Sequence, residues 1–105
     1  MANDIIRNYM RYLKLERNYT YNTLEAYRHD LEYLIEYARQ NDVALVDMKL
    51  ENLENFSASL HDKGIVARSQ ARILCGVRSF YRYLVTDGYI KDDPTELLPS
   101  PQIGE

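Results

Sequence analysis

The sequence has little proline, glycine or cysteine. Only three prolines occur in its 105 residues, all after position 93, and only four glycines. Proline disrupts the interior of a helix, so the first 93 residues are free to form long, uninterrupted helices. The single cysteine, Cys75, cannot form an internal disulfide, and the fold therefore does not depend on an oxidising compartment.

Long apolar runs are also missing. No stretch approaches the roughly 18 apolar residues of a membrane-spanning helix, and Arg7 and Arg11 interrupt the N-terminal stretch where a signal peptide would lie. Hydrophobic residues nevertheless make up 46% of the chain, which is enough for one small globular core. We therefore expect a soluble, cytoplasmic protein with no membrane partner.

The spacing of apolar residues predicts an all-α fold without a sheet, because they recur at intervals of three and four. Four helices are expected, over about residues 3–17, 20–40, 49–62 and 67–87. Thr20 and Asn22 compete as the cap of the second helix, and Gly64 and Gly88 are stop signals after the third and fourth. The predicted buried stripes are Ile6, Tyr9, Met10 and Leu13; Leu24, Tyr27, Leu31, Leu34, Ile35 and Ala38; Leu50, Leu53, Phe56 and Leu60; and Ile73, Leu74, Val77, Phe80, Tyr81 and Leu84.

Charge is unevenly distributed along the chain, although the net charge is only −3. Residues 25–64 carry nine acidic and four basic groups, whereas residues 65–86 carry four arginines and no acid. The local field decides which partner a surface attracts, so the net charge does not exclude nucleic acid.

The basic residues of the fourth predicted helix lie on one face. At about 100° per residue, Arg68, Arg72, Arg78 and Arg82 fall within an arc of about 120°, opposite the apolar stripe. Cys75 and Ser79 fall in the same arc. The planar guanidinium suits phosphate oxygens and guanine edges. This pattern indicates nucleic-acid binding, and an ordinary solvated face is the alternative, although such faces usually mix both signs of charge.

The start of the second predicted helix is a candidate anion site. It combines unpaired backbone amides with Thr20, Asn22, Thr23 and Arg28, and helix N-termini attract anions. The alternative is that these polar side chains only cap the helix. The outward side beyond them is acidic and unattractive to phosphate.

Catalytic and metal-binding patterns are poor. His29 and His61 have no second histidine or cysteine at a metal-ligand spacing, and Cys75 has no plausible histidine partner. There is no glycine-rich phosphate loop. We expect no metal, no cofactor and no catalytic residue, and therefore no enzyme.

Several segments together resemble the start of Xer-type tyrosine recombinases and phage integrases. The likeness covers nearly the whole chain in order. Its segments are YLKLERN at 12–18, TYNTL at 20–24, YRHDL at 27–31, ARSQARIL at 67–74, VRSFYRYL at 77–84, GYI at 88–90, DPT at 93–95 and LL at 97–98. The sequence departs from the family pattern at Val66, where serine is frequent, at Cys75-Gly76, where Ser-Ala is common, and at His29, where a basic residue is frequent.

The resemblance implies a core-binding domain with a SAM-like fold, an orthogonal four-helix bundle made of two helical hairpins. Residues 1–90 would form this domain, and residues 91–105 would begin the linker to a C-terminal catalytic domain that the chain lacks. Neither histidine begins the family's catalytic His-x-x-Arg, since His29 leads to Glu32 and His61 to Gly64.

The resemblance also implies a function and a set of partners. The domain would bind double-stranded DNA, in a sequence-specific or semi-specific manner, during site-specific recombination or integration. Its partners would be DNA, its own catalytic domain and other recombinase protomers; the isolated domain would be monomeric and bind weakly. The predicted DNA-binding residues are Thr20, Asn22, Thr23, Arg28, Arg68, Ser69, Arg72, Arg78, Ser79 and Arg82. On this hypothesis Arg72→Glu abolishes binding without loss of helicity. The alternative is a helical protein-interaction domain without DNA affinity.

Overall fold

A computed structural model describes residues 2–98, with side chains from Asp4 onward. Its elements are α1 (Ala2–Leu15), α2 (Tyr21–Gln40), the short 3-10 helix η1 (Leu45–Asp47), α3 (Leu50–Asp62) and α4 (Ala67–Thr86). Every regular element in residues 2–98 is helical, which confirms the all-α prediction. The 3-10 helix η1 was not predicted, because a single turn is too short to show a period in the sequence. Residues 99–105 of the predicted linker, including Pro99 and Pro101, lie outside the described residues.

The helix ends follow local signals in the sequence. Thr20 rather than Asn22 caps α2, since its hydroxyl oxygen accepts a hydrogen bond from the backbone N–H of Thr23 at 3.3 Å, and Asn22 lies within the helix. Gly64 and Gly88 follow α3 and α4 with φ of +82° and +83°, a conformation that favours glycine. Both predicted stop signals are therefore confirmed.

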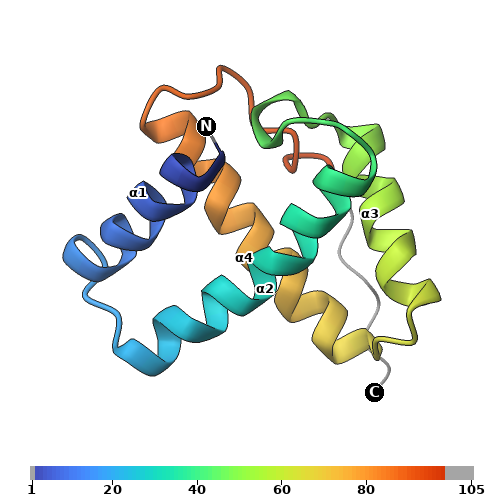
Figure 1. Ribbon diagram of the computed structural model, residues 1–105, viewed down its shortest axis with the longest axis horizontal. Coiled ribbons are helices and arrows are strands. Elements are labelled where there is room, and N and C mark those ends of the chain that lie inside the picture. The colour runs from blue at the N-terminus through green and yellow to red at the C-terminus, as the bar shows by residue number, and fades with distance from the viewer. Residues whose placement is uncertain (1, 99–105) are drawn as a thin grey trace.

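The four long helices form two hairpins that pack crosswise, α1 with α2 and α3 with α4 (Figure 1). The most extensive contact is between α2 and α4, which cross near the centre of the view. Asp30, near the middle of α2, and Gly76, near the middle of α4, lie together at this crossing. This arrangement confirms the predicted orthogonal bundle.

The core lies between the hairpins. All six apolar residues predicted to be buried on α4 are at most 1% exposed, as the spacing indicated. Residues at the edges of the predicted stripes are only partly buried, because the neighbouring helices cover them from one side. These are Ile6, Met10, Leu24, Tyr27, Ile35 and Leu50.

An aromatic cluster attaches α1 to α4. The ring of Tyr9 is fully buried and lies edge-on to Phe80, with 5.2 Å between ring centroids, and 5.3 Å from Tyr83. Tyr12 adds a second contact with Tyr83 at 4.9 Å. The Tyr9 hydroxyl donates a hydrogen bond to Ser79 Oγ at 2.9 Å. Four of these five residues are aromatic, and three of them are among the ten tyrosines of the chain.

The residues after α4 pack against the bundle. Thr95 and Leu98 are buried, although they lie in the segment predicted to begin a linker. The carboxylate of Asp93 accepts hydrogen bonds from the Thr95 backbone N–H at 2.8 Å and from its hydroxyl at 2.6 Å. This turn fixes the direction of the chain as far as Leu98.

Replacing Gly76 by alanine should stabilise the fold. A Cβ atom at this position would lie 3.6 Å from the Asp30 Cβ and 3.8 Å from the Tyr27 ring, which is ordinary contact distance. Glycine costs about 0.5–1 kcal/mol relative to alanine within a helix. We therefore expect Gly76→Ala to raise the free energy of unfolding in urea by about that amount. The matched change Gly88→Ala should lower it, because Gly88 has φ of +83°. A loss of stability in Gly76→Ala would contradict this prediction.

Buried tyrosines should make the fold sensitive to alkali. Tyr81 is fully buried and its hydroxyl donates to the Leu45 carbonyl at 2.8 Å; burial, and to a lesser degree Asp93, raises its pKa. Burial likewise raises the pKa of Tyr9. Unfolded tyrosines ionise near pH 10, so the stability is fully present below about pH 10 and is lost as the pH rises toward the folded values. Urea unfolding from about pH 8 to about pH 11 should show this decline, with a shallower slope in Tyr81→Phe. A stability that does not change with pH would contradict it.

Candidate nucleic-acid interface

Helix α4 carries positive charge without any acidic residue. Arg68, Arg72 and Arg82 are exposed, and Arg78 is half-buried. Val66, the residue before the helix, makes no side-chain capping bond, as expected from its lack of a hydroxyl. The predicted basic face therefore exists, but its four arginines have different surroundings.

Arg68 and Arg82 are the unpaired arginines of this face. Neither forms an ion pair with any residue in the range 4–98. They are 14 positions apart, which corresponds to about 21 Å along the helix axis. Both are therefore available to an external anion, and their separation exceeds that of adjacent phosphates on one DNA strand.

Arg72 is bound to α2. Its Nη2 atom lies 3.0 Å from Asp30 Oδ1, and the side chains are 60% and 5% exposed respectively. The aspartate is buried beneath the arginine, so the pair closes the α2–α4 crossing at the surface. A buried carboxylate without a partner would be costly, and Arg72 supplies that partner.

Arg78 contacts the segment that follows α4. Its Nη2 donates to the backbone carbonyl of Leu98, and its Nε is buried without a hydrogen-bond partner among the described residues. Arg78 lies at the edge of the predicted arc, where the segment after α4 covers it. The structure thus places three of the four predicted arginines on an exposed face, and the fourth against the C-terminal segment.

The smaller residues of the face also differ. Ser79 is half-buried and accepts the hydrogen bond from Tyr9, so it supports the attachment of α1. Ser69 is half-buried near the start of α4, and Cys75 is exposed with a free thiol. Of the two serines predicted to bind DNA, Ser79 therefore has a structural partner within the domain.

The start of α2 presents polar groups to solvent. Thr20, Asn22 and Arg28 are exposed and Thr23 is half-buried. The Thr20 hydroxyl lies 3.1 Å from that of Thr23, and both belong to the cap. In Figure 1 the first halves of α2 and α4 lie on the same side of their crossing, whereas the second half of α4, which carries Arg78 and Arg82, lies beyond it.

An aromatic stack lies next to the start of α2. Tyr19 and Tyr27 are parallel, with 5.4 Å between ring centroids, and the Arg17 guanidinium lies over the Tyr19 ring at 5.4 Å. Burial, together with Tyr19, raises the pKa of Tyr27 to about 12. The stack fixes the α1–α2 connection next to the capping threonines.

Comparison with known proteins decides the family. The family model described as "Phage integrase, N-terminal SAM-like domain" matches residues 6–88, which include all four long helices in whole or in large part. The chain belongs to this family. The resemblance drawn from the sequence is thereby confirmed, and the SAM-like fold with it.

Curated relatives of this SAM-like domain are tyrosine recombinases. The chain is 38% identical to tyrosine recombinase XerC of Pseudomonas syringae pv. syringae over 95 residues, which cover 90% of the chain and 32% of the relative. It is 32% identical to tyrosine recombinase XerD of Rhizobium meliloti over 102 residues, which cover 97% of the chain and 33% of the relative. It is 36% identical to tyrosine recombinase XerD of Yersinia pestis over 101 residues, which cover 96% of the chain and 34% of the relative. No solved structure is significantly similar to the chain.

The chain spans about a third of the length of the curated relatives it matches. The matched family model is that of the N-terminal domain. The 105 residues are therefore the SAM-like domain and not a catalytic domain, as the sequence predicted.

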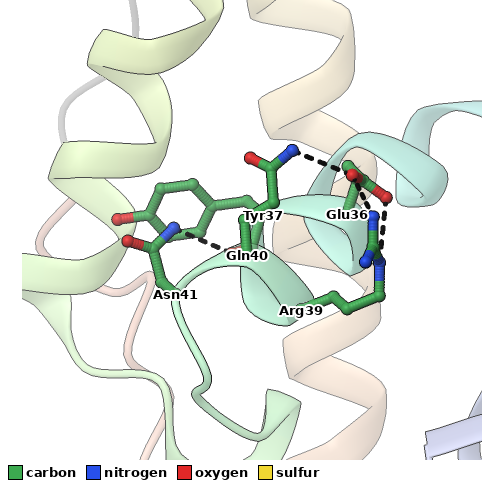
Figure 2. Close-up of polar contacts among 5 residues, drawn as sticks. All are labelled: Glu36, Tyr37, Arg39, Gln40 and Asn41. Carbon is green, nitrogen blue, oxygen red and sulfur yellow. Dashed lines mark hydrogen bonds and ion pairs between the residues drawn. The ribbon is translucent and has the colours of Figure 1, made fainter.

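The C-terminal half of α2 differs in its ion pairing from the arginine face, the surface of α4 that carries Arg68, Arg72 and Arg82. Figure 2 shows Glu36 holding two neighbours: Arg39, whose Nε donates at 3.2 Å, and Gln40, whose amide donates at 2.9 Å. Asn41 closes the helix end by donating to the Tyr37 carbonyl at 2.9 Å. Arg39 is thus neutralised by a local acid, unlike Arg68 and Arg82.

No metal site or membrane-spanning helix is found among the described residues of the SAM-like domain. Residues 4–98 contain no group of three histidine, cysteine or acidic side chains that could hold a metal ion. His29 packs edge-on against Tyr33, with 5.8 Å between centroids. No helix in the described part of the chain is long and apolar enough to cross a membrane.

Asp30, the buried partner of Arg72, was not among the candidate residues predicted from the sequence. It follows Tyr27 by three positions and precedes Leu34 by four, so it lies on the buried stripe of α2, where an acid is unusual. That position was a usable signal, because a buried acid requires a cationic partner. The partner itself depends on how α2 and α4 cross.

Proposed function

We propose that this SAM-like domain binds double-stranded DNA as the core-binding domain of a site-specific tyrosine recombinase. Residues 1–90 would form the binding unit, and residues 91–105 would begin the linker to a catalytic domain. DNA, that catalytic domain and other recombinase protomers would be its partners. Membership of the integrase family and the names of the relatives support the recombination role.

One observation carries the proposal: three exposed arginines on a helix that has no acid. Arginine forms charge-assisted hydrogen bonds with phosphate, and a helix of this width enters the major groove of DNA. The helix start at Thr20 adds backbone amides and a favourable dipole for a further phosphate. Phosphate contacts would fix the register on DNA and base contacts would supply any sequence preference.

Amide-resolved NMR titration with a generic DNA duplex, first at low and then at higher salt, tests the proposal. Amide shifts confined to residues 20–28 and 68–82 that fade with salt are expected, because phosphate contacts release counterions. The amides of α3 serve as the internal reference and should not move. The affinity should be weak, since a single domain lacks the avidity of a two-domain clamp.

A titration without shifts at low salt would contradict the proposal. Concentration-dependent self-association, or shifts with a protein partner in place of DNA, would then support a helical protein-interaction domain. The arginine face would in that case bind an acidic protein surface.

A further inference from the structure

The arginine face is divided by its ion pairing. Arg68 and Arg82 have no acidic partner among the described residues, whereas Arg72 is paired with the buried Asp30 at 3.0 Å. Arg72 keeps 60% of its side chain exposed despite this pair. Asp30 therefore holds the guanidinium of Arg72 on its buried side, and the remaining part of the guanidinium is accessible to a ligand.

The pair makes Arg72 a poor phosphate ligand. The carboxylate of Asp30 compensates its charge locally, and a phosphate on the same guanidinium would be repelled by that carboxylate. A phosphate that binds to Arg72 would also release few counterions, because the Arg72–Asp30 pair has no net charge. The unpaired Arg68 and Arg82 are the better phosphate ligands.

The same pair makes Arg72 suitable for reading a base. A guanidinium has five N–H donors, and Asp30 engages only Nη2, so other donors remain for the O6 and N7 atoms of guanine. A base edge is neutral overall and tolerates a nearby carboxylate better than a phosphate does. Holding the side chain in one orientation before binding also reduces the entropy lost when it contacts the base.

We propose that Asp30 is a positioning residue that fixes Arg72 for the recognition of guanine in the major groove, while Arg68 and Arg82 bind phosphates. This inference rests on the proposed function. It assigns specificity to the centre of the α2–α4 crossing and affinity to the ends of α4. The competing role for the pair is a structural link between α2 and α4.

Two readouts on the same 105-residue chain separate these roles. Selection from a randomised duplex pool measures base preference, and the salt dependence of binding to one generic duplex counts phosphate contacts. Asp30→Asn should reduce the preference for guanine at one position by about tenfold, with an equal or steeper salt slope. Arg68→Ala should instead reduce the salt slope by about 0.9.

Arg72→Lys provides a second variant that does not unpair the buried carboxylate. It keeps the charge but loses the planar fork, so guanine preference should fall while the salt slope is unchanged. Glu36→Gln is the matched control, since it removes the acidic partner of an arginine outside the interface, and it should alter neither readout.

Retained guanine preference in Asp30→Asn and Arg72→Lys would overturn the inference and leave the pair as a structural link. A wild-type chain that binds with a salt slope but without any guanine preference would also overturn it, while the proposed function would stand. A wild-type chain that does not bind DNA would overturn both.

Discussion

Reversing the charges of Arg68 and Arg82 together should remove most of the affinity for duplex DNA and leave the helical fold intact. Both side chains are exposed and unpaired among the described residues, so the Arg68→Glu/Arg82→Glu variant breaks no ion pair of the fold. Two phosphate contacts would be lost and two repulsive charges gained. We expect affinity at low salt to fall by about 100-fold and the salt slope by about 1.8.

The matched control is Arg7→Glu/Arg11→Glu on α1. These arginines are also exposed, and the double change alters the net charge of the chain by the same amount. The control should retain affinity within a few-fold if the local field of α4 attracts the DNA. Equal losses in both variants would mean that net charge alone controls binding. No loss in either would contradict the assignment of the arginine face. Circular dichroism of each variant reports whether the helices remain.

Arg72→Glu, which the sequence alone recommends, is a less direct test of this face. The new carboxylate would lie against Asp30, which is buried and would lose its partner. Like charges at this distance destabilise the fold, so a loss of binding would be inseparable from a loss of structure. The unpaired arginines avoid this difficulty.

The arginine face shows which features of the structure can be predicted from the sequence. Angular spacing predicts which residues share a face of α4, because each angle depends on one helix only. The partners of Arg72 and Arg78 depend instead on how α4 meets other parts of the chain. Asp30 reaches Arg72 through the crossing of two helices, and Leu98 reaches Arg78 through an irregular turn without a period.

The same distinction applies to the core. The apolar stripe of α4 was predicted residue by residue, and all of it is buried. The attachment of α1 was not predicted, since Tyr9 and Ser79 are 70 positions apart and nothing local connects them. Whether a segment forms a helix follows from its local sequence pattern, whereas the contacts between helices depend on how the helices pack together.

Tyr9→Ala should be the most destabilising single change in this region. The side chain is fully buried and its ring contacts both Phe80 and Tyr83 on α4. Deleting a buried aromatic ring removes apolar contact and leaves a cavity, at a cost of about 3–5 kcal/mol. Domains of ordinary size have about 5–15 kcal/mol of stability, so a large part of the total would be lost. Urea unfolding followed by circular dichroism measures the difference.

Tyr9→Phe separates the ring from the hydroxyl. It keeps the aromatic contacts and removes only the hydrogen bond to Ser79, so the expected loss is about 0.5–1.5 kcal/mol. A loss in Tyr9→Phe as large as that in Tyr9→Ala would show that the hydrogen bond rather than the ring attaches α1. Ser79 also belongs to the predicted DNA-binding set, and Tyr9→Phe releases its hydroxyl. A change in DNA affinity in this variant, without a large loss of stability, would therefore connect the attachment of α1 to the arginine face.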